Sequence, residues 1–253
     1  MDIGGGRSIW AIAVVSDTRL LYIVNLTKKV ILLNSQTGGT VAQITLKGSP
    51  HRVCMIDNTM AVVTLGNKGL QFININGDSL EFARSIRVNG IVWGISRSED
   101  RLIVSYVSPP RLEVLSMDGR LIHTFSNQAA AVDAFQWPIF ISTSADDMIY
   151  VSDGSKSTIT QLDSNLRVTR TYSDPILRKP YGIICVSADQ LLVCSHNNHR
   201  ILLLYPSTGG ITRILDLQDR IMEPYALTYS QSLKKLYVVP YECSGRIQVY
   251  QQH

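Results

Sequence analysis

The chain has 253 residues, of which 45% are hydrophobic and 17% charged, with a formal net charge of +4. This composition excludes a disordered charged tail and a coiled coil, and the length allows a buried core without a disulfide or metal as staple. No apolar run approaches the roughly 20 residues of a membrane helix, and the opening MDIGGGRSIW lacks the apolar segment of a signal peptide. The 4 cysteines are widely spaced, which is typical of reduced thiols. We therefore expect a cytoplasmic protein without membrane association.

Six similar passages follow one another along the chain. Each has an apolar strand, a Ser/Asp turn and a second apolar strand, then a polar loop, a third strand and a Gly or Asn turn. The expected pairs of first and second strands lie at residues 12–25, 53–66, 94–107, 139–153, 183–196 and 226–240. The expected third strands lie at 29–34, 69–76, 111–116, 158–163, 200–205 and 246–250.

The spacing of these passages predicts the fold. They begin near residues 8, 50, 91, 138, 180 and 224, which gives periods of 42, 41, 47, 42 and 44 residues. A period of about 40–50 residues with four strands per repeat is typical of β-propeller blades. We predict an all-β, six-bladed β-propeller with four-stranded antiparallel blades, forming one domain over residues 1–253. The last copy has room for three strands only, so we expect the N-terminal residues 1–7 to close the ring by pairing in the last blade.

The fifth copy has the most specific motif. It reads PYGIICV from Pro180, then LLVCS, then HNNHRI from His196 to Ile201. It resembles the NHL repeat, whose blade begins with a Pro-aromatic-Gly-apolar step and has an Asn-His/Arg-Arg-Ile turn before its third strand. The fourth and sixth copies match this pattern loosely, and the first three keep its hydrophobic positions. The resemblance implies the C-terminal domain of a tripartite-motif ubiquitin ligase, in which RING, B-box and coiled coil precede the propeller.

The order of the strands predicts an asymmetric distribution of charge. With strands a to d in each blade, the b–c and d–a loops lie on one face and the a–b and c–d loops on the other. By our assignment of loops, the first face has 14 basic and 6 acidic residues, net +8, and the second has 7 basic and 10 acidic residues, net −3. We call the face made by the b–c and d–a loops the basic face. Such a field concentrates anionic partners.

The basic face is the predicted binding site. Cations interleaved with aromatic rings suit single-stranded RNA, because the cations follow phosphates and the rings stack on bases. The resemblance supports this ligand, since some tripartite-motif NHL domains bind single-stranded RNA on the equivalent face. The alternative partner is an acidic protein segment, bound by a protein- or peptide-binding scaffold without a nucleic-acid role. The predicted RNA- or partner-binding residues are Lys28, Lys29, Lys47, His51, Arg52, Lys68, Arg87, Trp93, Arg111, Lys156, Arg178, Lys179, Tyr181, His199, Arg200, Tyr225 and Arg246.

The sequence offers little for catalysis or for metal binding. His196 and His199 form an HxxH pair, but a zinc site needs about four ligands, and Asn and His also suit a tight turn. Asp146 and Asp147 occupy an a–b turn in which other copies also have aspartate. No GxSxG or HExxH motif occurs. We therefore expect no cofactor, no metal and no enzyme activity, with a metal-dependent propeller hydrolase as the distant alternative. We expect the isolated domain to be monomeric and its parent protein to oligomerise through the coiled coil.

Overall fold

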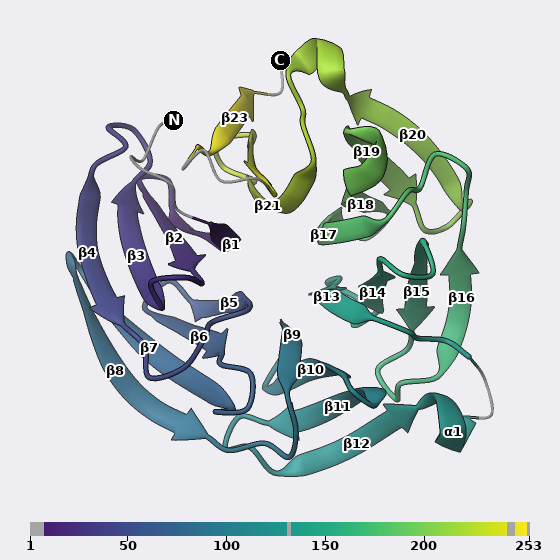
Figure 1. The fold of residues 1–253 in the computed structure, drawn as a ribbon, viewed down its shortest axis with the longest axis horizontal. Helices are drawn as coiled ribbons and strands as arrows, with labels where there is room; N and C mark the ends of the chain where they lie inside the picture. Colours follow the sequence, from purple (N-terminus) through teal and green to yellow (C-terminus); the bar gives the residue numbers. More distant parts are fainter. Residues whose placement is uncertain (1–7, 131–132, 242–245, 252–253) are drawn as a thin grey trace. The chain divides into compact units, whose positions relative to one another are not determined.

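The computed structural model describes residues 8–130, 133–241 and 246–251. In this part the chain is almost entirely β-structure, arranged as six successive antiparallel sheets (Figure 1). The helical segments described are α1 (Asn127–Ala130) and the short 3-10 turns η1 (His196–Asn198) and η2 (Leu217–Asp219). This architecture confirms the predicted all-β, six-bladed propeller. All three helical segments are far too short to cross a bilayer.

The chain divides into two compact units. The first unit is Met1–Ile91 with Tyr225–His253. Its first sheet has the order β1 (Ile9–Ser16), β2 (Arg19–Val24), β3 (Lys29–Asn34), β4 (Thr40–Thr45). Its second sheet has the order β5 (Val53–Asp57), β6 (Met60–Thr64), β7 (Leu70–Asn76), β8 (Ser79–Ile86). In the described residues its last sheet comprises β21 (Pro224–Ser230), β22 (Lys235–Pro240), β23 (Gln248–Gln251).

The second unit is Val92–Pro224 and also contains three sheets. The first of them has the order β9 (Val92–Ser98), β10 (Arg101–Val107), β11 (Pro110–Ser116), β12 (Leu121–Ser126). The next has the order β13 (Pro138–Thr143), β14 (Ile149–Asp153), β15 (Thr158–Leu162), β16 (Val168–Tyr172). The last has the order β17 (Pro180–Ser187), β18 (Gln190–Ser195), β19 (Arg200–Tyr205), β20 (Gly210–Leu215).

Burial follows the position of a strand within its sheet. The middle strands β2 and β3 are buried over most of their length, whereas the outer strand β4 is partly exposed throughout. Strands covered on both faces need apolar runs, and the second strand of each sheet contains such a run. In the first unit, Leu21 and Ile23 of β2 share one core with Val63 and Ile73 of the next sheet. In the second unit, Ile103 and Val151 occupy a separate core.

Hydroxyl groups on the second strand of a sheet connect it to the first strand of the next. In the second unit, Ser105 Oγ accepts a hydrogen bond from Gly94 N (2.9 Å) and donates one to Pro138 O (2.9 Å). Ser152 Oγ, one sheet later, donates to Tyr181 O (2.7 Å). Gly94 allows this approach, because a Cβ atom at that position would lie 2.5 Å from Ser105 Oγ. These buried bonds fix where the first strands β9, β13 and β17 of the second unit begin.

Two further predictions about the architecture remain untested. The N-terminal residues 1–7, which we expected to close the ring, lie outside the described residues. The single domain over residues 1–253 stays a prediction, because the two units are each compact in their own right. Five of the six predicted repeat starts agree with the strands, because β1, β9, β13, β17 and β21 begin within about one residue of the expected positions. The exception is β5, which begins at Val53 and not near residue 50.

Candidate nucleic-acid interface

In the first unit, the b–c and d–a loops lie together as predicted. Leu46 N, at the end of the first sheet, donates to Lys28 O in the b–c turn (2.7 Å). Asn25 Nδ2, in the same turn, donates to Pro50 O (2.8 Å). His51 N donates to Thr64 O at the end of β6 (2.9 Å). The loops of the basic face in this unit are therefore joined by hydrogen bonds to backbone carbonyls.

Four exposed cations lie on these loops, and we call them the cationic rim: Lys28, Lys47, Lys68 and Arg87. Neighbouring loops bring them close together. A Cβ atom at Gly48, next to Lys47, would lie 3.0 Å from Lys68 Cγ. A Cβ atom at Gly69 would lie 2.1 Å from Ile86 O and 3.2 Å from Arg87 Cα. Among the described residues, no member of the rim forms an ion pair. The loop segments 25–28, 46–52, 65–69 and 86–91 contain no Asp or Glu.

Aromatic rings gather where the first strands of this unit begin, and we call Trp10, His51, Tyr225 and Tyr241 the aromatic cluster. The Trp10 ring centroid lies 5.8 Å from that of His51 and 6.3 Å from that of Tyr225. Tyr225 is 5.3 Å from Tyr241, whose side chain is 49% exposed. Trp10 and His51 are half-buried, whereas Tyr225 is buried. Three of the four rings therefore present some surface for stacking beside the cationic rim.

Sequence reasoning missed Trp10 and Tyr241 as members of the predicted site. Trp10 occupies the same place at the start of a first strand as the predicted Trp93. Tyr241 directly follows β22 in a b–c loop, the kind of loop from which the other predicted residues were taken. Equivalence between repeats was the signal that could have identified both.

Arg52 was predicted to contact the ligand, but the structure buries it. Its side chain is directed inward: Nη1 donates to His51 O (2.7 Å) and Trp10 O (3.2 Å), and Nη2 donates to Tyr225 Oη (3.0 Å). The residue is 3% exposed. The buried Arg52 side chain thus stabilises the aromatic cluster through these hydrogen bonds and is not positioned to bind a phosphate.

Several predicted cations of the second unit are engaged within the protein. Lys156 Nζ forms an ion pair with Asp133 Oδ2 at 2.7 Å. Arg111, predicted in a loop, instead lies in β11, where it pairs with Glu113 (2.9 Å) and stacks on the Tyr106 ring at 3.6 Å. Tyr106 Oη donates to Glu113 (2.6 Å), and burial together with this carboxylate raises the Tyr106 pKa. The expectation that Arg111 and Lys156 offer free charge to a ligand is therefore corrected.

The count of acidic residues on the basic face also changes, because Asp153 is fully buried. Its Oδ2 atom accepts hydrogen bonds from Gln136 N (2.6 Å) and Trp137 N (2.7 Å). Its Oδ1 atom accepts from Ser155 N and Lys156 N, both at 3.0 Å. Four backbone donors satisfy this carboxylate, which joins the segment before β13 to the turn after β14. Asp153 is a structural residue and contributes no exposed charge to the face.

The HNNH motif of the second unit is a structural turn. His196 N donates to Lys179 O (3.3 Å), and Asn198 Nδ2 donates to Ile176 O (2.7 Å). His199 adopts the left-handed conformation (φ 55°), and its Nδ1 accepts from Glu223 N at 3.0 Å. Burial lowers the pKa of His196. Across residues 8–130, 133–241 and 246–251, no three His, Cys, Asp or Glu side chains are grouped to hold a metal ion.

The remaining predicted residues differ in their exposure. Arg178 is exposed, and its Nε donates to Pro175 O. Lys179 Nζ lies 5.5 Å from the ring centroid of Tyr181, and Tyr181 itself is buried. Trp93 packs edge-on against Trp137, with ring centroids 6.3 Å apart. The other three are placed as follows: Lys29 Nζ donates to Gln43 Oε1, Arg200 is half-buried and Arg246 is exposed.

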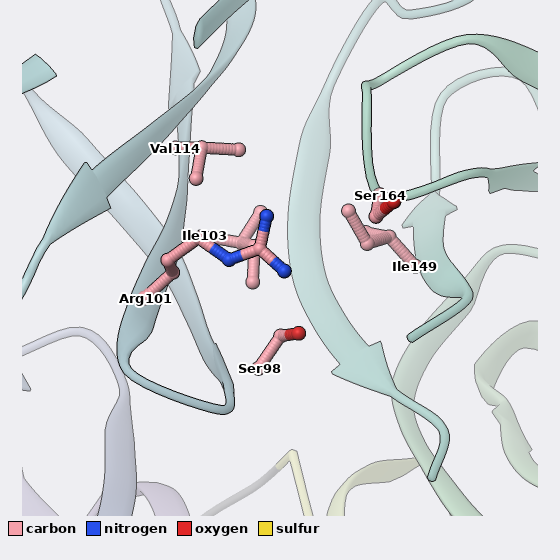
Figure 2. A pocket seen from close by; sticks show the side chains of 6 residues that line it. All are labelled: Ser98, Arg101, Ile103, Val114, Ile149 and Ser164. Atoms are coloured by element: carbon pink, nitrogen blue, oxygen red, sulfur yellow. The ribbon is translucent and has the colours of Figure 1, made fainter. Parts of the chain in front are cut away.

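A shallow pocket lies on the a–b and c–d face of the second unit, and Figure 2 shows it from close by. Ser98, Arg101 and Ile103 line it from one sheet, and Ile149 and Ser164 from the next. Ser98 Oγ also donates to the Asp147 carboxylate. The Arg101 guanidinium lies in the middle of these side chains (Figure 2). The pocket has no room for a water molecule, so it is not a ligand site.

Comparison with known proteins establishes the fold and no family. No protein-family model matches the chain, and no curated protein matches it significantly. Among solved structures, a streptogramin B lyase matches with TM-score 0.72 at 14% identity, over 98% of this chain and 84% of that one. A virginiamycin B lyase from Staphylococcus aureus matches with TM-score 0.71 at 14% identity, over 99% and 86%. The Cps50 (Swd1) β-propeller domain from Myceliophteria thermophila matches with TM-score 0.69 at 14% identity, over 97% and 84%.

These matches contradict the prediction that the chain is not an enzyme. Two of the three structures are lyases with the same propeller fold, although at low identity. The prediction depended on the absence of two hydrolase motifs and on the interpretation of His196, His199, Asp146 and Asp147 as turn residues. The absence of such a motif excludes only the reaction types that use it, and one fold can support many kinds of catalysis. The absence of GxSxG and HExxH is therefore no argument against catalysis on this propeller.

Proposed function

We propose that this chain is a recognition domain that binds single-stranded RNA through the cationic rim and the aromatic cluster of its first unit. The observation that carries the proposal is the rim itself: four exposed cations on adjacent loops, with no acidic residue in those loops. Lys and Arg side chains in such a row neutralise consecutive phosphates. The partly exposed rings of Trp10, His51 and Tyr241 offer stacking surface for unpaired bases.

We favour the first unit over the second as the binding site because several cations of the second unit already interact with other side chains of the protein. In the second unit, Lys156 and Arg111 are already paired with carboxylates, and Lys179 lies over a tyrosine ring. A cation that must first leave an internal partner gains less from a phosphate. The four rim residues have no such partner to leave among the described residues.

The parent protein we propose is a tripartite-motif ubiquitin ligase, with this domain recruiting RNA or substrate. The support is the resemblance of the fifth repeat to NHL repeats, from Pro180 to Ile201. An acidic protein segment is the rival ligand for the same surface. RNA is favoured because its unpaired bases can stack on the aromatic cluster, whereas the carboxylates of an acidic segment would use only the cationic rim.

The test is fluorescence anisotropy of the protein with a degenerate single-stranded RNA pool, titrated with salt. A quadruple variant, K28Q/K47Q/K68Q/R87Q, removes the cationic rim. The matched control, R120Q/R167Q/K234Q/K235Q, removes the same formal charge from the a–b and c–d loops and from Lys235, the first residue of β22. We expect the rim variant to reduce the slope of log affinity against log salt by about 3, because each phosphate contact contributes about 0.7 for single strands. The control should retain the slope of the unaltered protein.

Three outcomes contradict the proposal. Equal losses in the two variants would show that net charge, and not the rim, determines binding. Absence of RNA binding even at low salt would remove RNA as the ligand. Binding of poly-glutamate with the same rim dependence, but no RNA binding, would assign the surface to an acidic protein segment.

A further inference from the structure

One side-chain hydrogen bond joins two distant loops of the second unit. Glu223 N, directly before β21, donates to Nδ1 of His199, which ends the turn between β18 and β19. Both residues have positive φ, 55° at His199 and 41° at Glu223, which is unfavourable for non-glycine residues. Neighbouring groups therefore hold the Glu223 backbone in an unfavourable conformation, and the hydrogen bond to His199 is one of these contacts.

The bond imposes a protonation state on His199. An amide N–H can only donate, so Nδ1 must be the unprotonated nitrogen and Nε2 must carry the proton. A histidinium has N–H groups at both positions and cannot accept. Histidine ordinarily changes charge between about pH 5 and 8. We propose that His199 is a pH-sensitive latch, closed on Glu223 at neutral pH and open in mild acid. This proposal does not rest on RNA binding.

The charged groups around His199 include some that favour a positive charge at this turn and some that disfavour it. The Glu223 carboxylate favours a positive charge at this turn. Three cations disfavour a positive charge at this turn: Lys179, Arg178 and Arg200. The carbonyl of Lys179 accepts from His196 N, the carbonyl of Arg178 accepts from Asn197 N, and Arg200 directly follows His199. The second imidazole, His196, is buried against the Tyr181 ring at 5.0 Å, and burial lowers its pKa. His199 is half-buried and its Nδ1 holds the Glu223 amide, so it is the imidazole of the pair on which the latch depends.

Other bonds limit how far the latch can open. Ile221 is fully buried and its N donates to Asp216 O (3.0 Å), and Asp216 and Asp219 cap the η2 turn reciprocally. These contacts are independent of His199. Opening would consequently free Met222, which is 61% exposed, and Glu223, and it would relax the positive φ of Glu223. The Glu223 backbone also lies against the His196 side chain, so opening would expose that buried imidazole.

The test is hydrogen exchange of the Glu223 amide, followed by NMR at about pH 7.5 and pH 5.5. His199→Asn is the locked variant: its Oδ1 can accept in place of Nδ1, does not titrate, and asparagine tolerates the left-handed conformation. His199→Ala is the open variant. Comparison at one pH cancels the intrinsic pH dependence of exchange. The buried Val193 amide of β18 reports whether each variant retains the fold.

At pH 7.5 we expect the original protein and His199→Asn to be equally protected, and His199→Ala to exchange about five- to tenfold faster at Glu223. At pH 5.5 the original protein should reach the rate of His199→Ala, while His199→Asn remains protected. Equal protection of the original and the locked variant at pH 5.5 would overturn the latch. So would full protection of His199→Ala at pH 7.5.

A second measurement needs no variant. The imidazole ¹⁵N shifts of the unaltered protein should show an unprotonated Nδ1 at pH 7.5. The Glu223 amide shift should then follow the titration of His199 and not that of the exposed His123 on β12. A protonated Nδ1 at pH 7.5, or a Glu223 shift that does not follow His199, would contradict the proposal.

Discussion

Nη2 of Arg52 donates to Oη of Tyr225 at 3.0 Å, and the guanidinium carbon lies 5.1 Å from the centroid of that ring. The two residues are separated by 173 positions in the sequence. The contact joins the segment before β5 to the beginning of β21, within the first unit. It combines a hydrogen bond with a cation–π contact in a site from which water is largely excluded.

Replacement of Arg52 should therefore affect stability first. Arg52→Gln removes the donors to Trp10 O, His51 O and Tyr225 Oη, and we expect the free energy of unfolding to fall by about 2–4 kcal/mol. Urea denaturation measures the loss. Arg87→Gln is the matched control, since Arg87 is exposed and should change stability by less than about 0.5 kcal/mol. Similar values for both variants would contradict the buried role of Arg52.

Asp153→Asn should destabilise the second unit without a change in volume. An asparagine side chain has one oxygen acceptor, so two of the four backbone donors now bound by Asp153 would face an amide NH₂ group. We expect a loss of about 2 kcal/mol in chemical denaturation. Asp146→Asn, at an exposed turn position, should be nearly neutral. A neutral Asp153→Asn would mean that the backbone donors find other acceptors.

The protein should lose stability in alkali. Burial raises the pKa of the Cys185 thiol to about 12 and raises the pKa of the tyrosines 106, 150, 172 and 237. The unfolded chain releases these protons at about pH 9–10, so above that range the native state binds more protons. The free energy of unfolding must then fall as pH rises.

Scanning calorimetry between about pH 8 and 11 measures this loss. The contribution of each group is fully present below its unfolded pKa and disappears as the pH rises towards its folded pKa. Cys185→Ala should make the decline less steep, because one of the groups is removed. A melting temperature that is constant across the range would contradict the assigned burial.

Tyr241→Ala separates stacking from charge on the basic face. Tyr241 is 49% exposed, so its loss should cost little stability. We expect RNA affinity to fall by about 1–3 kcal/mol per lost stacking contact, with the salt slope unchanged. Anisotropy with RNA and with polyphosphate distinguishes the two effects, because polyphosphate has no bases. An equal loss for both ligands would argue against stacking on this ring.

The repeat pattern was sufficient to predict the six sheets and, for all but the second sheet, the positions at which they begin. Each passage has two apolar strands, a turn and a third strand, and only a stacked arrangement of such units buries both faces of every sheet. The same pattern placed the loops of Lys28, Lys47, Lys68 and Arg87 on one face, because antiparallel strands alternate direction. These features depend on local sequence and on a repeating geometry, and both can be read along the chain.

The tertiary structure decided which of the charged side chains are available. Arg52 and Arg87 are both basic residues before a first strand, yet Arg52 is buried under Tyr225 and Arg87 is exposed. Asp153 and His199 similarly acquire their roles from partners 16 and 24 positions away. Sequence determines which residues occur in a loop. The exposure and protonation of a side chain depend on groups brought near it by packing, and that proximity exists only in the folded chain.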